Sequence, residues 1–402
     1  SIVVLEDVSI KDYDKDGDTT KISTEIAADS RLVILDGDTS KLTDSEKTLT
    51  DLSGTSSSAN TEYGQGPTGQ NSVALGNVSG AGSLTIVGDK DRTEGVAAYN
   101  NIGDKDDKLS VEIGNIGDGK TKFGEVNIVD ADIAVSGDKG IDKVTTVTLV
   151  NSVTTVDNGG VTTLGLDVNS ESSLTAKKDI DNMTMQGGGH VDISGKVESV
   201  TGNVMLSNGM EEEGYGVKEG ATIIAKGDVV MSNVDGNKIL ELDAKTGDLY
   251  LTTESTIDDS KNIHVGNDLI LDVGSELNRS EATVEGNVLV TDKAPGSASE
   301  RAIASKIDSS RITVNPKGTS TVEISDGSTM TDSFINGANG DITIGGEGTL
   351  LGGTTPTKTI VGISEGSEAA KDFISDGDDK KGNLADVLKQ AKENGASSPK
   401  IR

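Results

Sequence analysis

Four aspartates near the start of the chain have the types and the spacing to bind a metal ion: Asp12, Asp14, Asp16 and Asp18, in the sequence DYDKDGD. Alternate carboxylates on a short turn can converge on one hard cation, and Gly17 allows that turn to be tight. The pattern matches the first half of a calcium-binding loop, D-x-D-x-D-G. We therefore predict that these four aspartates bind calcium.

The second half of this segment departs from the calcium-loop pattern. The glutamate that closes such a loop is expected at Ser23, whereas Glu25 follows two residues later. No helical pattern flanks the segment, so it is not an EF-hand. A solvated acidic turn is the alternative interpretation, and the sequence leaves both open.

Other turns also carry two or three carboxylates, and we interpret each of them as a surface corner: Asp36/Asp38, Asp89/Asp91, Asp104/Asp106/Asp107 and Asp376/Asp378/Asp379. Together with a formal net charge of −31, these turns favour divalent cations at the surface. We expect calcium to stiffen the folded chain.

Residues that usually carry catalysis are scarce. The 402 residues include two histidines, His190 and His264, and no cysteine, which excludes thiol nucleophiles and Cys/His metal sites. Carboxylate pairs occur throughout an acidic chain, so they do not single out a glycosidase site. Three Phe, five Tyr and no Trp are few for the aromatic platforms of sugar-cleaving proteins. We interpret both histidines as ordinary strand residues and predict that the protein is not an enzyme.

Charge and hydropathy exclude several classes of partner. With 36 Lys and Arg against 67 Asp and Glu, the chain is unsuited to nucleic acid or to an anionic membrane. No apolar run approaches about 18 residues, so we expect no membrane insertion. The absence of cysteine excludes a disulfide framework. We interpret Ser1 as the end left by removal of a signal peptide and therefore predict an extracellular location.

The elements that position these residues follow from a short pattern that returns five times. Each copy has Gly or Asn, then Asn or Asp, then a short apolar run typical of a β-strand. The intervals between the first apolar positions are 25, 20, 20 and 19 residues, for Val204, Val229, Leu249, Leu269 and Val288. A period of about 20 residues is typical of solenoids.

We therefore predict an all-β fold, a parallel β-helix (β-solenoid) with coils of about 20 residues. Short strands cannot bury an apolar face alone, but strands stacked at about 4.8 Å share one core. The Gly and Asx residues before each run are expected to supply the positive φ of a sharp corner. The alternative is a series of tandem β-sandwich domains with evenly spaced strands.

The same period extends upstream, with steps of 21, 17, 19 and 21 residues through Val126, Val147, Leu164, Met183 and Val204. Downstream the alternation continues with wider gaps. The expected division is 1–60 for N-terminal strands, acidic turn and loop, 61–355 for the solenoid body, and 356–402 for a linker, a helix and a basic tail.

A short helix is predicted over residues 384–394. Its apolar residues follow the i, i+3, i+4, i+7 pattern of one helix face: Leu384, Val387, Leu388 and Ala391. The helix is expected to cap the open end of the solenoid or to contact another subunit. Residues 1–10, predicted to contain a strand, are the second expected contact between subunits.

The repeated Gly-Asn/Asp-apolar-x-apolar coils between Leu84 and Ile344 resemble haemagglutinin-type adhesins and autotransporter passenger domains, which are secreted bacterial β-helices. The resemblance implies an architecture and an extracellular location. A further segment, residues 71–76 with 79–82, is similar to the head repeat of trimeric autotransporter adhesins. That family repeats the unit in tandem, whereas this chain has it once.

We therefore expect a structural, non-enzymatic protein that assembles with copies of itself into a cell-surface fibre or surface layer (S-layer). Backbone ladders would supply stiffness, acidic turns would recruit calcium, and the two ends would supply the contacts. The alternatives are a monomeric surface adhesin that binds a host or glycan ligand, and a glycan-processing β-helix similar to a tailspike or lyase.

Overall fold

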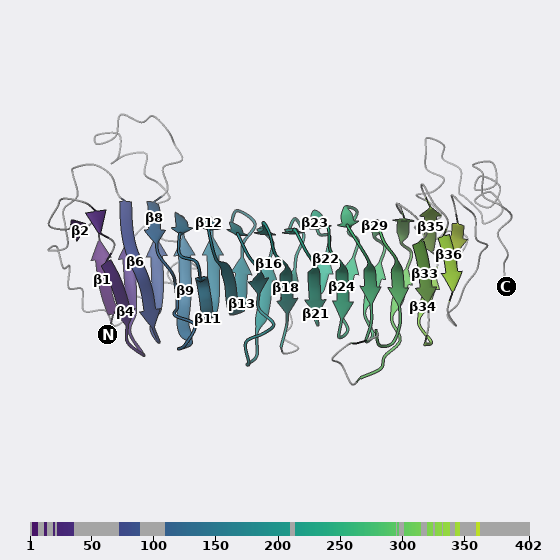
Figure 1. The fold of residues 1–402 in the computed structure, drawn as a ribbon, viewed down its shortest axis with the longest axis horizontal. Coiled ribbons are helices and arrows are strands. Elements are labelled where there is room, and N and C mark those ends of the chain that lie inside the picture. The colour runs from purple at the N-terminus through teal and green to yellow at the C-terminus, as the bar shows by residue number, and fades with distance from the viewer. Residues whose placement is uncertain are drawn as a thin grey trace, which may run out of the picture. The chain divides into compact units, whose positions relative to one another are not determined.

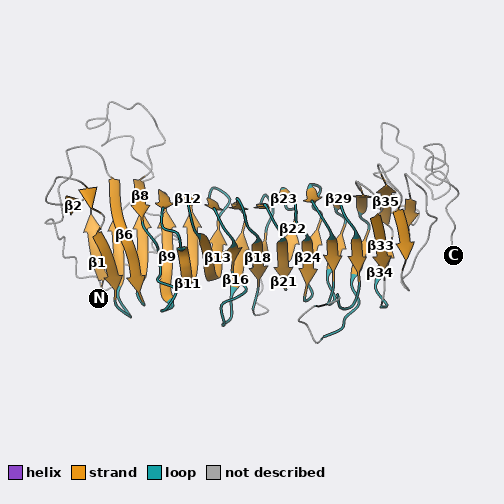
Figure 2. Ribbon diagram, in the orientation of Figure 1, coloured by secondary structure: helices purple, strands orange, loops and turns teal. Residues whose placement is uncertain are grey.

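The computed structural model describes most of the central chain and parts of both ends: residues 2–6, 12–13, 19–20, 22–35, 72–88, 109–209, 214–294, 296, 301–314, 320–324, 326–331, 333–337, 342–345 and 359–361. All regular structure in these residues is β-strand, which confirms the all-β class (Figure 1, Figure 2). No helix among them is long and apolar enough to cross a membrane. The chain divides into two compact units, residues 1–201 and 202–402.

In the second unit, the repeated strands form the first wall of a β-solenoid: β18 (Val204–Ser207), β21 (Val229–Ser232), β24 (Leu249–Thr252), β27 (Leu269–Leu271), β30 (Val288–Val290), β33 (Ser320–Ile324) and β36 (Ile342–Gly345). Val229 pairs with Leu249, and Leu269 pairs with Val288. Val204 and Leu249 continue the same row, and every pairing along it is parallel. The predicted stack of coils is therefore confirmed.

Two further walls complete each coil of this unit. The second wall contains β19 (Gly216–Val217), β22 (Asp235–Asn237), β25 (Thr256–Asp258), β28 (Glu276–Asn278), β31 (Lys306–Asp308) and β34 (Thr329–Thr331). The third wall contains β20 (Thr222–Ala225), β23 (Glu241–Ala244), β26 (Ile263–Val265), β29 (Glu281–Val284), β32 (Arg311–Val314) and β35 (Ser333–Gly337). The chain passes through all three walls before it returns to the first.

Alternation along each strand separates the core from the outer face. In β21, Val229 and Met231 are fully buried, whereas Val230 and Ser232 point outward and are partly exposed. Full burial of a Val, Leu or Met side chain contributes about 1.5–3 kcal/mol. Small branched residues therefore fill the coil without the large aromatics that a compact globular core needs.

The corners between the second and third walls contain residues with positive φ that are not glycine: Lys238, Asp259, Arg279 and Ser309. A buried serine follows the corner residue in successive coils. The Ser260 amide donates to Ser280 Oγ at 3.1 Å, and the Ser280 amide donates to Ser310 Oγ at 3.1 Å. These serines satisfy backbone donors that the sharp corner removes from the strand ladder.

The first unit is also a parallel β-solenoid. One long sheet contains β1 (Ile2–Glu6), β5 (Arg31–Leu35), β7 (Ser83–Val87), β9 (Phe123–Val129), β11 (Gly140–Val150), β13 (Gly160–Val168) and β16 (His190–Ile193). The other contains β4 (Ile22–Ile26), β6 (Ser72–Gly80), β8 (Leu109–Ile113), β10 (Ala131–Val135), β12 (Val153–Val156), β14 (Ser173–Ala176) and β17 (Lys196–Ser199). A short third side includes β15 (Ile180–Asp181), which pairs with the start of β13.

The predicted register is right at Val126 and Val147, which pair directly, but it is wrong at Leu164. Val147 pairs with Leu166, two residues further along the strand. Leu164 and Leu166 are 5% and 0% exposed. Because both leucines are buried in the same strand, spacing alone does not decide which one stacks on Val147.

The strand position predicted at Met183 is also wrong, because Met183 lies in a turn. The Asp181 carboxylate accepts the amide of Met183 at 2.7 Å and that of Thr184 at 3.1 Å. Asp181 thus satisfies backbone donors that a strand would pair with its neighbours. Leu166 pairs instead with Val191, so this coil is longer than its neighbours.

Antiparallel pairing occurs only at two places among the described strands of the two units. β2 (Asp12–Tyr13) pairs with β3 (Thr19–Thr20), and β37 (Thr359–Val361) pairs with β35. The other pairings within each unit are parallel, which excludes tandem β-sandwiches. The helix predicted over 384–394 lies outside the described residues. The boundaries 1–60, 61–355 and 356–402 remain predictions.

Candidate functional site

The predicted calcium segment begins in a β-hairpin of the first unit. In this hairpin Asp12 lies opposite Thr20 and Tyr13 lies opposite Thr19. Asp14, Asp16 and Asp18 belong to the connection between the two strands and lie outside the described residues. Within the described part of the chain, no three His, Asp or Glu residues are grouped so as to hold a metal. Calcium binding at Asp12, Asp14, Asp16 and Asp18 therefore stays a prediction.

A column of Asn and Asp side chains runs along the corner between the third and first walls of the second unit. This Asx column comprises Asn203, Asp228, Asp248, Asp268 and Asn287. The Oδ1 atom of each member accepts the backbone amide of the next, at 2.8, 2.8, 2.9 and 2.6 Å in chain order. The column therefore ties each coil to the next outside the strand ladders.

Glycines precede most members of the Asx column, and their role differs from the one predicted. Positive φ was expected, but none of Gly227, Gly247 and Gly286 has it. A Cβ atom on Gly227 would lie 2.1 Å from Asn203 Oδ1, and one on Gly247 would lie 2.3 Å from Asp228 Oδ1. Glycine is therefore needed because the side chain of the preceding coil occupies the space of a Cβ.

The chemistry of the Asx column combines negative charge with backbone donors. Asp228, Asp248 and Asp268 follow one another at the coil spacing of about 4.8 Å. Charge-assisted hydrogen bonds from backbone amides are stronger than neutral ones and offset repulsion between the carboxylates. The Asn267 side-chain amide adds a further bond to Asp248 Oδ1 at 2.7 Å. The column fixes the register of the coils and places carboxylates along one edge of the first wall.

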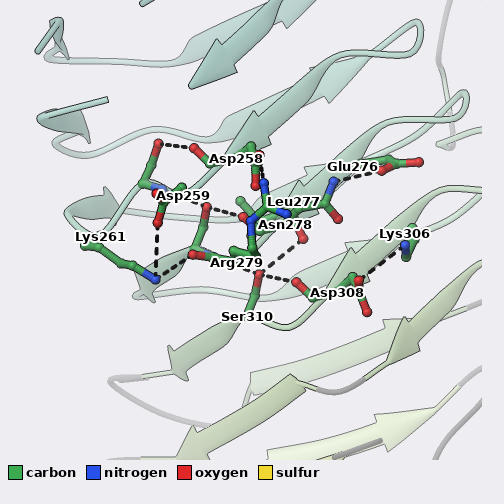
Figure 3. A network of polar contacts seen from close by, with 12 residues as sticks. Asp258, Asp259, Lys261, Glu276, Leu277, Asn278, Arg279, Lys306, Asp308 and Ser310 are labelled. Atoms are coloured by element: carbon green, nitrogen blue, oxygen red, sulfur yellow. Dashed lines mark hydrogen bonds and ion pairs between the residues drawn. The ribbon is translucent and has the colours of Figure 1, made fainter. Parts of the chain in front are cut away.

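A network of ion pairs covers the corner between the second and third walls (Figure 3). Arg279 pairs with Asp258 of the preceding coil. Lys261 Nζ lies 3.8 Å from Asp259 Oδ1 and donates to the Arg279 carbonyl at 2.6 Å. The Arg279 side chain is 55% exposed, and exposed ion pairs contribute about 0–1 kcal/mol each. The network links neighbouring coils and contains no nucleophile with an adjacent base.

Each histidine lies beside an aspartate. His190 Nε2 is 2.9 Å from Asp167 Oδ1 in the first unit, and His264 Nδ1 is 2.7 Å from Asp243 Oδ1 in the second. His264 lies in β26, in register with Asp243 of β23, and its side chain is 40% exposed. The prediction of ordinary strand positions is consistent with this placement, but the aspartate partners were not foreseen.

The fully buried carboxylate of Asp272 was not identified from the sequence. Asp272 is fully buried after β27, and its Oδ2 atom accepts the Tyr250 hydroxyl at 2.7 Å and the Ala294 amide at 3.1 Å. These bonds hold the segment after β30 against the corner of the first wall. In the sequence Asp272 resembles any other acidic turn residue, so no local signal separates it from an exposed aspartate.

In the first unit, Asp118 lies in a turn whose backbone hydrogen bonds lower the pKa of its carboxyl from the ordinary value of 3.8. The amides of Thr121 and Lys120 donate to its Oδ1 atom at 2.9 and 2.8 Å, and both bonds favour the charged form. Because the folded state favours the charged Asp118 carboxylate, these bonds stabilise the fold at pH values above its ordinary pKa. The stabilisation is lost as pH falls through the lowered pKa of the folded state. Asp118 is partly exposed and, among the described residues, its carboxylate bonds only amides of its own turn, so we interpret the segment as a structural turn.

Comparison with models of protein families, with curated proteins and with solved structures gives no match. The resemblance of the coils to secreted β-helix adhesins therefore remains an expectation from the sequence pattern.

Proposed function

We propose that this protein is a structural, non-enzymatic subunit of an extracellular fibre or surface layer that assembles from copies of itself. The observation that supports the proposal is the continuous register of short parallel strands within each unit. Each internal strand is hydrogen-bonded on both sides, and this makes a stack of coils resistant to bending and extension. A stiff body with a highly charged surface suits a mechanical role.

Assembly in this proposal uses the N-terminal and C-terminal segments of the chain. β1 is the first strand of the first unit and pairs with β5 along one edge (Figure 1). Its second edge would be the template to which a strand of another chain is added. Residues 1–10 would provide one contact, and residues 384–394 would provide the second.

Calcium would favour this assembly by two routes. It would bind at Asp12, Asp14, Asp16 and Asp18, and it would reduce repulsion between copies that each carry a net charge of −31. The acidic corners of the second unit, including Asp248 of the Asx column, add to that repulsion. Assembly is therefore expected to depend on divalent cations.

Negative-stain electron microscopy of the purified protein, in millimolar calcium and in EGTA, tests the proposal. Filaments or lattices are expected in calcium, and deletion of residues 1–6 should prevent them because it removes β1. Deletion of the basic tail, residues 397–402, is the matched control and should leave assembly intact.

Isolated particles under both conditions, from protein that retains its β circular dichroism, would contradict the proposal. That outcome would favour a monomeric surface adhesin. Turnover of an acidic polysaccharide would instead favour the glycan-processing alternative.

A further inference from the structure

An apolar row lies on the outer face of the first wall in the second unit. The apolar row consists of side chains that pair in register from one strand to the next: Met205, Val230, Tyr250, Ile270 and Leu289. Each of them alternates with buried neighbours, points outward and is partly exposed. The row ends at Glu323 of β33, which is exposed.

The other two walls of this unit carry polar outer rows. The second wall has in register the outer residues Thr256, Glu276 and Lys306. The third wall has in register Asp243, His264 and Thr283. Outward residues do not contribute to the core, so the coil itself does not require the apolar row. In a chain with 33% hydrophobic residues, a continuous apolar row that is partly exposed favours an interaction surface.

We propose that the apolar row is a lateral contact between two copies of this chain that lie face to face and antiparallel. The inference rests on the proposed self-assembly and supplies its sideways contact. In this arrangement β21 of one copy lies opposite β30 of the other, and β24 lies opposite β27. Tyr250 then contacts Ile270, and Val230 contacts Leu289. The Tyr250 hydroxyl is bonded to Asp272, which fixes the ring on this face.

Charges beside the apolar row match this arrangement. Lys226 and Glu285 each follow the last residue of a third-wall strand, Ala225 and Val284, and these two strands belong to one stack. Lys226 and Glu285 therefore occupy the same column, at β21 and β30. Antiparallel copies place Lys226 of one opposite Glu285 of the other.

The Asx column follows the same symmetry. Asp228 faces Asn287 of the second copy, so a carboxylate meets an amide. Asp248 faces Asp268, which is unfavourable by itself, and Lys245 is exposed at the same corner. The two Lys226–Glu285 contacts of an antiparallel pair are complementary in charge, and they support this orientation.

The size of the contact determines its strength. In this register four strands, β21 to β30, bring apolar residues together, whereas Met205 of β18 lies opposite Glu323 of β33. Four strands at a spacing of about 4.8 Å, each about 10–13 Å long, give a face on the order of 200 Å². Stable protein interfaces bury about 800 Å² per partner. The lateral contact is therefore weak between two free molecules and becomes effective where many copies lie side by side in a fibre or layer.

Sedimentation velocity of the full chain over a range of concentrations, in calcium, tests the contact. Ile270→Lys should weaken lateral association about tenfold or more, because it buries a charge against Tyr250. Thr283→Lys, on the outer face of the third wall, is the matched control and should have no effect. Circular dichroism melting checks that each variant is folded.

A charge exchange tests the orientation. Lys226→Glu and Glu285→Lys should each weaken association about two- to fivefold, as expected for an exposed ion pair. The double variant should restore it, because each pair is re-formed with its charges exchanged. Unchanged association of Ile270→Lys, or failure of the double variant to recover, would overturn the proposal.

Electron microscopy of Ile270→Lys separates this inference from the proposed function. Single filaments that no longer associate sideways would support both end-to-end assembly and the lateral contact. Filaments that still associate sideways would overturn the lateral contact alone. Paired particles of the native chain that never lengthen, and that separate in Ile270→Lys, would support the lateral contact and contradict end-to-end assembly.

Discussion

At the residue scale, the Gly–Asx pair acts as an interlocking unit between coils. The Asx side chain accepts a backbone amide of the next coil, as Asp228 does from Asp248 at 2.8 Å. The glycine of the next coil leaves room for that side chain, as Gly247 does for Asp228. Glycine takes this position at Gly227, Gly247 and Gly286. Asn267 takes it before Asp268 and adds a side-chain bond of its own to Asp248.

A substitution at Asp248 tests how much its hydrogen bonds to the next coil stabilise the fold. Asp248→Ala removes the acceptor of the Asp268 amide and of the Asn267 side chain, so we expect a loss of about 1–3 kcal/mol in the free energy of unfolding. Asp248→Asn keeps an acceptor oxygen and is the control. Urea denaturation compares the two, and equal losses would show that the hydrogen bonds contribute little.

A substitution at Gly247 tests whether the space it leaves for the Asp228 side chain is needed. Gly247→Ala places a Cβ about 2.3 Å from Asp228 Oδ1 and from the Gly227 carbonyl carbon, so the coils must separate locally. We expect a loss of about 1–3 kcal/mol, as for overpacked cores. The exposed neighbour Lys226→Ala should change little. A melting temperature of Gly247→Ala equal to that of the native chain would contradict the steric role.

At the element scale, each strand is a few residues long, and its two faces do different things. In β27, Leu269 and Leu271 are fully buried in the coil, whereas Ile270 points outward. The three residues are similar in type, so their position in the register decides their energetic role. Their strand gains stability from β24 and β30 on either side.

Two substitutions in β27 separate these roles. Leu269→Ala should destabilise the chain by about 2–5 kcal/mol, because it leaves a cavity in the core. Ile270→Ala should cost much less, because its side chain is partly exposed. Chemical denaturation of both variants checks the expectation. Similar costs would mean that the outer face is packed as tightly as the core.

At the scale of the whole molecule, charge is the dominant property. A net charge of −31 opposes both compaction and contact between copies, and hydrogen-bonded Asx and serine columns hold neighbouring coils together against it. Cations that bind the folded chain shift the folding equilibrium towards it. Calcium should therefore affect stability and assembly together.

Calcium should raise the melting temperature of the native chain by several degrees relative to EGTA. Binding to the folded state alone stabilises it by about 2.7 kcal/mol at a hundredfold excess over Kd. A variant with Asn at Asp12, Asp14, Asp16 and Asp18 should lose most of this shift, and magnesium at equal ionic strength controls for screening. An unchanged melting temperature in calcium would contradict the predicted site.

The sequence by itself determined the solenoid, because the period of about 20 residues and the alternation of apolar positions are local properties that stacking must satisfy. The rows through Val229, Leu249, Leu269 and Val288 follow from it directly. The tertiary structure decided which of Leu164 and Leu166 stacks on Val147. It also decided that Val191, and not Met183, is the next residue of this row. Both choices depend on coil length, which turns such as that of Asp181 set.

Only the tertiary structure decided the role of the glycines, the burial of Asp272 and the alignment of the apolar row. Each of these depends on residues about 20 positions apart in sequence that stacking brings to about 4.8 Å. A sequence pattern shows that Gly247 and Asp228 belong to successive coils, but not that one occupies the space left by the other. The fold could be predicted from local spacing, whereas these contacts arise from the distance between coils.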